Sequence, residues 1–216
     1  MVLKQFLQKC GLQIVTHLGA LTPLLLLAWK YWQGAFLIDP VREITTATGK
    51  TALILLLLAL ACTPINTVFG FRGVVRVRRA LGLYAFFYAG LHFFTFVGLD
   101  YQFDGRLIRQ AVLEQRYVLA GTTAGLLMLP LAITSTKGWQ RRLGKNWKRL
   151  HRLVYLSGAL AVVHFLWLVK DSREPMRYGL LLALLLLLRW PAVRRTVSHL
   201  RHRLATRRTR PEQRLT

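Results

Sequence analysis

The sequence predicts an all-α membrane protein, built as a bundle of six transmembrane helices. Of its 216 residues, 54% are hydrophobic, and the mean hydropathy is +0.36. The hydrophobic residues fall in long blocks with the charged residues between them, and a helix needs about 20 mainly apolar residues to cross about 30 Å of hydrocarbon. The basic residues are also shared unevenly between alternate loops, which is typical of a multi-pass membrane protein.

Six apolar blocks are long enough to span a membrane. No small-residue cleavage site follows the first block, so we expect a retained helix rather than a signal peptide, with Pro23 as a point where it can kink. Asp39 and Pro40 predict a helix start, with Asp39 as the N-cap and Pro40 at the first helical position. Gly121 and Gly125 have the spacing that lets helices approach closely. The blocks are residues 11–32, 51–68, 80–99, 117–135, 150–169 and 178–193.

The loop charges predict the orientation in the membrane. With six spans, 22 of the 31 lysines and arginines fall on the side that holds both termini, and seven of the eight acidic residues fall on the other side. Lys and Arg mark cytoplasmic loops. We therefore expect a bacterial inner-membrane protein with cytoplasmic N- and C-termini, in which residues 1–193 form the transmembrane domain and residues 194–216 form a basic cytoplasmic tail.

The net charge of +23 also raises the question of nucleic-acid binding. The positive residues lie in short loops and a tail beside apolar blocks, where they act as topology signals. Membrane lipid is therefore the expected surrounding, and nucleic acid is not an expected partner.

Histidines are the residues in the spans that carry chemistry. Four of them, His17, His92, His151 and His164, lie in or at the edge of apolar blocks. One such histidine is most simply a neutral residue bonded to a neighbouring helix, but several on different spans favour a cofactor. Neutral imidazole is a usual axial ligand of haem iron. The chain has no C-x-x-C-H motif for covalent c-type haem, so the sequence indicates b-type haem.

Depth restricts how these histidines can pair. His151 and His164 are 13 residues apart on one predicted helix, which separates them by about 20 Å, too far to share an iron. His92 and His164 should both lie roughly 18–21 Å from the cytoplasmic side, so they are the predicted axial pair. His151 belongs to a second level nearer the cytoplasm. His17, about 10 Å deep, is a weaker candidate for a haem ligand there and otherwise a packing or quinone-site residue.

The electron donor must be a separate molecule. No G-x-G-x-x-G motif occurs, and no soluble segment is long enough for a nucleotide-binding domain. Electrons would therefore come from a membrane quinol or from a separate flavin reductase.

Three stretches resemble one known family. They are Leu143-Gly144-Lys145-Asn146-Trp147-Lys148-Arg149-Leu150-His151 with Tyr155-Leu156 and His164 following, Arg78-Arg79-Ala80-Leu81-Gly82-Leu83 leading to His92, and Asp39-Pro40-Val41 leading through Thr48-Gly49-Lys50-Thr51-Ala52-Leu53 into the second block. They resemble the haem-binding subunits MsrQ (also called YedZ) of bacterial periplasmic methionine-sulfoxide reductase systems, in the ferric reductase-like transmembrane domain superfamily. The resemblance covers nearly the whole chain short of the basic tail.

The resemblance implies an electron-transfer role. It implies b-type haem, one or two per chain, with His92, His151 and His164 as the haem residues. It also implies electron donation from the quinone pool to MsrP, a soluble periplasmic molybdenum-cofactor enzyme that reduces methionine sulfoxide in oxidised proteins. FMN is associated with the family, and no residue is assigned to it. The sulfoxide site would then lie on MsrP and not on this chain, which leaves open whether the chain is itself an enzyme.

Two other functions compete with this interpretation. The chain could be a free-standing transmembrane reductase of metal ions or oxygen. It could also be a non-redox transporter or scaffold whose histidines are structural. The depth-matched histidines speak against the scaffold, and only the family resemblance separates the other two.

Overall fold

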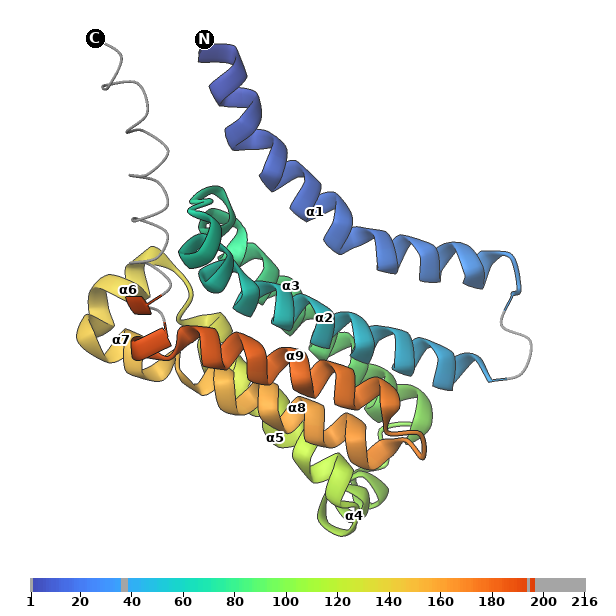
Figure 1. Ribbon diagram of the computed structural model, residues 1–216. Coiled ribbons are helices and arrows are strands. Elements are labelled where there is room, and N and C mark those ends of the chain that lie inside the picture. Colours follow the sequence, from blue (N-terminus) through green and yellow to red (C-terminus); the bar gives the residue numbers. More distant parts are fainter. Residues whose placement is uncertain (1, 36–38, 194, 197–216) are drawn as a thin grey trace, which may run out of the picture.

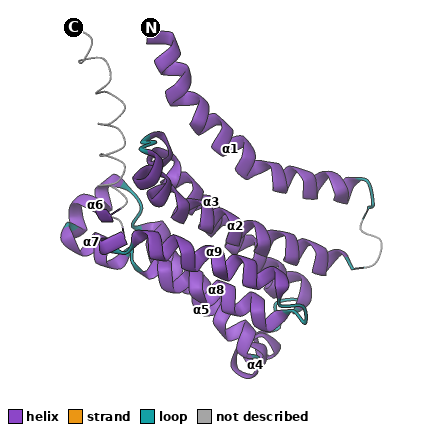
Figure 2. Ribbon diagram, viewed as in Figure 1, coloured by secondary structure: helices purple, strands orange, loops and turns teal. Residues whose placement is uncertain are grey.

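The computed structural model describes residues 2–35, 39–193 and 195–196, and all regular elements in these residues are helices (Figure 2). The predicted tail, residues 194–216, thus lies almost entirely outside the described residues. The elements are α1 (Val2–Trp32), α2 (Pro40–Phe69), α3 (Gly73–Thr95) with a π-helical extension η1 (Phe96–Asp100), α4 (Gly105–Glu114), α5 (Arg116–Ile133), α6 (Lys137–Leu143), α7 (Lys145–Leu150), α8 (Leu153–Leu168) and α9 (Arg173–Arg189).

The predicted bundle of six spanning helices is confirmed. Five helical segments of the described chain are long and apolar enough to cross a membrane: Gly11–Trp32, Pro40–Phe69, Gly73–Asp100, Arg116–Ile133 and Lys145–Leu168. The sixth, α9, has 17 residues, which is about 25 Å of helix and the lower limit for a span. It runs back along α8 and α2 (Figure 1).

The predicted boundaries of the second and sixth spans were wrong. Hydropathy indicates which residues lie in the hydrocarbon layer, and it does not indicate where a helix begins or ends. The second span begins at Pro40 rather than near residue 51. The predicted cap is confirmed, since the Asp39 carboxylate accepts a hydrogen bond from the Arg42 N–H at 3.0 Å. The helix that this cap begins is the spanning helix α2 itself. The first turns of α2 are polar, and the buried Thr48 hydroxyl there is satisfied because it donates to the helix's own Ile44 carbonyl at 2.8 Å. The sixth span, predicted at 178–193, ends at Arg189, just before Trp190 and Pro191.

Two of the five loops predicted between the spans contain helices. Residues 100–116 hold α4, whose first turn is capped by the Asp104 carboxylate. Residues 136–149 hold α6 and α7, and the Thr136 hydroxyl caps α6. Capping side chains satisfy the free N–H groups at a helix start, so segments too short to span the membrane can still be helical.

Helix α1 is bent, and a tyrosine explains the bend. Pro23 lacks a backbone N–H, and beside it the Tyr88 hydroxyl accepts from the Leu24 N–H at 3.1 Å and donates to the Ala20 carbonyl at 2.7 Å. Tyr88 thereby inserts into the hydrogen-bond ladder of α1, a known cause of kinks. Its side chain is fully buried, and it fixes the second half of α1 against α3 (Figure 1).

A second proline in a span is compensated in a similar way. Pro64 in α2 cannot donate to the Leu60 carbonyl, and Arg189 of α9 donates to that carbonyl instead, at 2.6 Å. The same guanidinium also donates to the hydroxyls of Thr63 and Tyr155. One side chain thus joins α9 to both α2 and α8 at the end of the bundle where α9 stops.

Two helix pairs, α2 with α3 and α5 with α8, form the centre of the bundle. The Ser157 hydroxyl of α8 is buried and donates to the Ala124 carbonyl of α5 at 2.9 Å. Ala85 of α3 is buried in the core cluster with Leu55 and Leu56 of α2. The end of the bundle with the α1–α2 connection and the α8–α9 turn is called the first end below. The end with α6, α7 and the α2–α3 turn is called the second end (Figure 1).

Candidate functional site

The two central helix pairs bring His92 and His164 together. His92 lies on α3 and His164 on α8, their ring centroids are 6.0 Å apart, and the ring planes are inclined at 78°. The depth argument predicted this pairing, and the structure confirms that the rings are neighbours. Their role as ligands is a separate question of chemistry.

Both imidazoles are held in the same tautomer. Nδ1 of His92 is 2.8 Å from the carbonyl oxygen of Thr45, and Nδ1 of His164 is 2.6 Å from the carbonyl oxygen of Tyr117. A carbonyl oxygen only accepts, so each Nδ1 carries the proton and donates it. Each Nε2 is then the unprotonated nitrogen, with a lone pair for a metal. Metal-bound histidines in proteins usually have this arrangement.

The spacing of the two rings fits one metal ion between them. Two metal–nitrogen bonds of about 2 Å, together with the step from each Nε2 to its ring centre, give a centroid separation of about 6 Å. Among the described residues no group of three or more His, Cys, Asp or Glu side chains could hold a metal ion, whereas a bare zinc ion takes three or four such ligands. Two imidazoles alone suit a metal whose other positions are filled by a macrocycle, as in haem.

His151 has different surroundings. Its Nε2 is 3.2 Å from the Thr134 hydroxyl, whose own hydrogen is donated to the Pro130 carbonyl at 2.6 Å. His151 is therefore the donor through Nε2, the opposite tautomer to His92 and His164. Its ring stacks on Trp147 at 4.0 Å, and the Trp147 indole donates to the Thr134 carbonyl. A metal or cofactor at His151 would therefore bind to Nδ1, or it would have to displace the Thr134 hydroxyl from Nε2.

The assumption that His151 and His164 share one uninterrupted helix was wrong. Helix α7 ends at Leu150, His151 is its C-cap residue, and α8 begins at Leu153. The two histidines still lie at opposite ends of the segment Lys145–Leu168. They therefore belong to different levels of the bundle, as predicted.

His17 packs against α3. Its Nδ1 is hydrogen-bonded to the Tyr84 hydroxyl at 2.9 Å, and the imidazole is exposed at the surface of the bundle. His17 and His151 thus have different neighbours, which speaks against their pairing on one iron. A groove of about 570 Å³ lies here between α1 and α3, lined by His17, Leu21, Arg76, Arg79, Ala80, Leu83, Tyr84 and Phe87.

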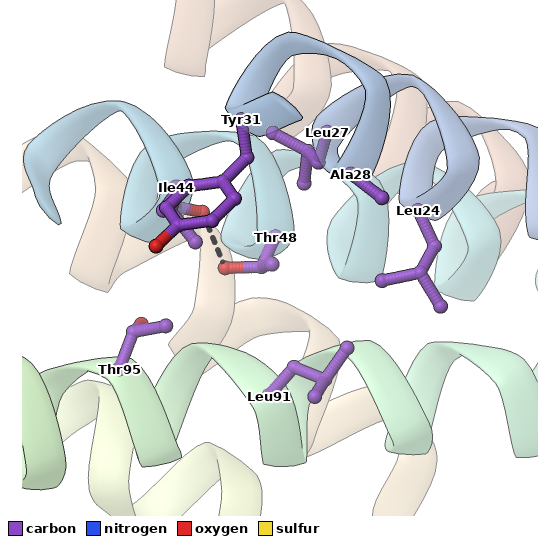
Figure 3. A pocket seen from close by; sticks show the side chains of 8 residues that line it. All are labelled: Leu24, Leu27, Ala28, Tyr31, Ile44, Thr48, Leu91 and Thr95. Atoms are coloured by element: carbon purple, nitrogen blue, oxygen red, sulfur yellow. Dashed lines mark hydrogen bonds between the residues drawn. The ribbon is translucent and has the colours of Figure 1, made fainter. Parts of the chain in front are cut away.

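A second cavity, of about 280 Å³, lies between α1, α2 and α3 (Figure 3). Its two threonine hydroxyls already donate to helix carbonyls, Thr48 to Ile44 and Thr95 to His92. The remaining lining is apolar except for Tyr31. The cavity therefore presents little chemistry of its own.

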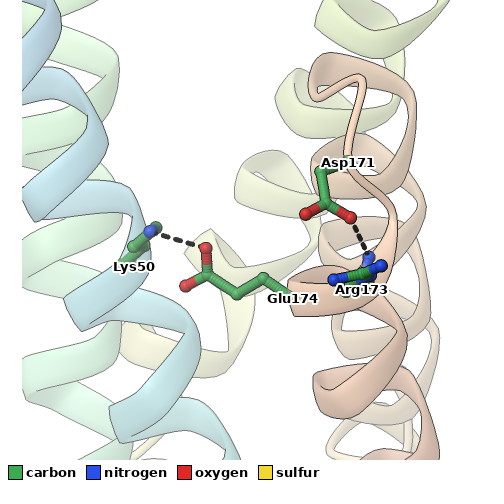
Figure 4. Close-up of polar contacts among 4 residues, drawn as sticks. All are labelled: Lys50, Asp171, Arg173 and Glu174. Atoms are coloured by element: carbon green, nitrogen blue, oxygen red, sulfur yellow. Dashed lines mark hydrogen bonds and ion pairs between the residues drawn. The ribbon is translucent and has the colours of Figure 1, made fainter.

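Ion pairs of the described residues lie at the first end, on the same side of the bundle as His92 and His164. Lys50 of α2 pairs with Glu174 of α9 at 2.8 Å, and Lys30 pairs with Glu43 at 2.9 Å. Beside the first pair, the Asp171 carboxylate accepts from the Arg173 N–H (Figure 4). The acidic residues of this end are thus largely engaged within the chain.

Comparison with known proteins identifies the class. The sequence model of the family described as ferric reductase like transmembrane component matches residues 47–162. The match spans more than half of the chain and runs through the two central helix pairs from residue 47 of α2 to Val162 of α8, two residues before His164. The chain therefore belongs to this family of multi-pass membrane proteins.

Curated relatives define the branch of the family. Proteins named protein-methionine-sulfoxide reductase heme-binding subunit MsrQ are 49% identical over 80% of this chain and 82% of the relative in Xanthomonas axonopodis pv. citri, and 41% identical over 86% and 91% in Rhodospirillum rubrum. A relative of the same name in Xanthomonas campestris pv. campestris is 46% identical over 85% and 87%. The chain is a member of the MsrQ family, as its motifs indicated. No solved structure matches it.

Proposed function

We propose that this chain holds haem b between α3 and α8 and passes electrons across the inner membrane to the periplasmic methionine-sulfoxide reductase MsrP. The observation that carries the proposal is the pair of imidazoles 6.0 Å apart, each with its Nδ1 proton donated to a helix carbonyl. The names of the relatives, which state heme binding and a methionine-sulfoxide reductase system, support it. Haem, when bound, supplies an iron that gains and loses one electron, at a potential tuned by its ligands and their hydrogen bonds.

The proposal gives each histidine a role. His92 and His164 are the axial ligands, and His151 binds a second cofactor at the second end, either another haem or the FMN associated with the family. No other residue is assigned to FMN. The sulfoxide is reduced on MsrP, so this chain supplies electrons for the repair of oxidised periplasmic proteins and no sulfoxide-binding site.

The orientation follows from the charges. The loops and helix ends at the second end, taken together with the two terminal segments of the sequence, contain 22 of the 31 lysines and arginines, so we propose that the second end and both termini face the cytoplasm. An alkaline phosphatase fused after Thr216 should therefore be inactive, because that enzyme folds only in the periplasm. The same phosphatase fused after Gly34, in the α1–α2 connection, should be active. Activity of the Thr216 fusion would reverse the topology.

The first end then faces the periplasm and is the docking side for MsrP. This side of the chain carries nine basic and seven acidic residues, and Glu43 and Glu174 are paired with lysines, so the face is near-neutral overall. Docking should therefore depend only weakly on salt.

Electrons are proposed to come from membrane quinol, from a cytosolic flavin reductase, or from both. The groove at His17 suits a quinol, since it combines apolar walls with the His17–Tyr84 pair, which would hydrogen-bond a quinol hydroxyl.

His17→Leu should slow haem reduction by a quinol analogue about tenfold or more, as loss of a proton acceptor does. The haem spectrum and dithionite reduction should not change. Thr22→Ala, an α1 variant outside the groove, is the control, and an unchanged quinol rate in His17→Leu would exclude the groove as the quinol site.

The central proposal is tested by absorption spectroscopy of the purified protein, with haem supplied during expression. A Soret band and the reduced bands of b-type haem are expected, together with oxidation of the reduced haem by purified MsrP. No Soret band would favour the scaffold function. Haem that reduces ferric iron or oxygen but not MsrP would favour the free-standing reductase.

A further inference from the structure

The two histidines are positioned by the same device, which occurs once in each central helix pair. His92 follows Thr45, the residue whose carbonyl it bonds, by 47 residues, and His164 follows Tyr117 by 47 residues. In each pair a glycine stands four residues after the accepting carbonyl, Gly49 in α2 and Gly121 in α5. The two halves of the site therefore have the same arrangement, in which a histidine is hydrogen-bonded to a helix carbonyl and a glycine follows that carbonyl by four residues.

Each glycine is in direct contact with its imidazole. A Cβ atom added to Gly49 would lie 2.9 Å from Nδ1 and 3.0 Å from Cε1 of His92. A Cβ atom added to Gly121 would lie 2.6 Å from Nδ1 and 2.9 Å from Cε1 of His164. Side-chain atoms essentially never approach so closely, so any larger residue would displace the ring.

The position of each glycine explains why the approach matters. A carbonyl within a helix points along the axis toward the residue four positions later, so the side chain at that position lies beside the oxygen. At Thr45 and Tyr117 the imidazole occupies the place that a Cβ atom at the fourth residue on would take, so at these two carbonyls the ring can approach the oxygen's free lone pair only because that residue is a glycine. Displacing the ring would lengthen the Nδ1–carbonyl bond and shift Nε2, the atom that would bind the metal.

We infer that Gly49 and Gly121 are positioning residues, each of which admits one axial imidazole to a helix carbonyl and so fixes its tautomer and direction. The inference rests on the proposed ligation by His92 and His164. Neither the carbonyls nor the glycines touch the metal, and they act only through the imidazoles. Hydrogen-bond partners of ligating histidines orient the ring and raise its basicity.

Two other glycines in the central helix pairs provide matched controls. Gly90 in α3 and Gly125 in α5 have no atom within 4 Å of an added Cβ. Although Gly125 stands one turn from Gly121 and was predicted with it to allow close helix approach, only Gly121 makes such a contact. Gly90→Ala and Gly125→Ala should therefore leave the site unchanged.

The first test compares haem binding in these four variants. Gly49→Ala and Gly121→Ala should each weaken haem affinity by about tenfold to a hundredfold, the range found for partners of metal ligands. They should also shift the haem midpoint potential and the low-spin EPR signal, which depend on ring orientation. Gly90→Ala and Gly125→Ala should match the wild type in all three measurements. Wild-type affinity, potential and EPR in both Gly49→Ala and Gly121→Ala would overturn the inference.

The second test needs no haem and uses thermal unfolding of the haem-free full-length protein in detergent. Gly49→Ala should lower the unfolding temperature in the wild type but not in a His92→Ala background, where the ring that clashes is gone. It should still lower that temperature in a His164→Ala background. Gly121→Ala should show the reverse dependence. Equal effects in both backgrounds would mean that the glycines do not act through the histidines.

The two tests also separate this inference from the proposed function. If His92→Ala and His164→Ala lose haem while both glycine variants keep wild-type properties, ligation stands and the positioning role fails. If the histidine variants keep their haem, the proposed ligation fails and the positioning role fails with it.

Discussion

Changing His92 or His164 to alanine should remove one and the same haem from the purified protein. The ring centroids are 6.0 Å apart, and the Nδ1–carbonyl bonds leave each Nε2 as the unprotonated nitrogen, so under the proposed ligation each variant takes one of two axial ligands from one iron. Loss of a hydrogen-bond partner of a ligand already weakens metal binding by about tenfold to a hundredfold, and loss of the ligand itself should cost more. Most of the reduced b-type absorption of that haem should therefore disappear in either variant.

The double variant distinguishes a shared iron from separate ones. Residues that act as a unit give strongly non-additive losses, so His92→Ala/His164→Ala should be little worse than either single change. His199→Ala, in the basic tail, serves as the control and should keep full absorption. Haem content, quantified per protein, is the measurement. Losses that add in the double variant would assign the two histidines to different haems.

That His92 and His164 are neighbours could be predicted from the sequence, because depth in a membrane follows from counting residues along a helix. The span that carries each histidine is long and apolar, and its basic flanks give the direction. The cap at Asp39 was equally readable, since a carboxylate followed by proline has a specific role at a helix start. The beginning of the second span could not be predicted, because the turns between residues 40 and 50 are polar and their hydropathy is typical of a loop.

The supporting shell of the site could not be predicted. Thr45 and Tyr117 act through backbone carbonyls, which every residue has, so no residue type marks them. The glycines did leave a signal, since Gly49 precedes His92 by 43 residues, as Gly121 precedes His164. This equal spacing indicates a contact between each glycine and its histidine only when it is known that α2 packs on α3 and that α5 packs on α8. The tautomer of His151 was also hidden, because it depends on Thr134, which lies 17 residues earlier, before α6 and α7.

His151→Ala should slow the entry of electrons while leaving their exit intact. The hydrocarbon layer is about 30 Å thick, and a haem at His92 and His164 lies toward the first end, far from a donor on the cytoplasmic side. A second cofactor at His151 would divide that distance. Reduction of the remaining haem by quinol or flavin reductase should slow about tenfold or more, the effect of roughly 1.4 kcal/mol on a barrier. Oxidation of pre-reduced haem by MsrP should stay near the wild-type rate.

A matched variant separates cofactor binding from a structural role of His151. Thr134→Val removes the hydroxyl that His151 bonds but keeps the imidazole and the shape of the neighbouring side chain. If His151 serves only to join α5 to the α7–α8 turn, Thr134→Val should slow reduction as much as His151→Ala does. If His151 binds a cofactor, Thr134→Val should keep most of the wild-type rate, because Nδ1 and the Trp147 stacking remain. Unimpaired reduction with loss of oxidation by MsrP in His151→Ala would instead reverse the direction of electron flow proposed for this bundle.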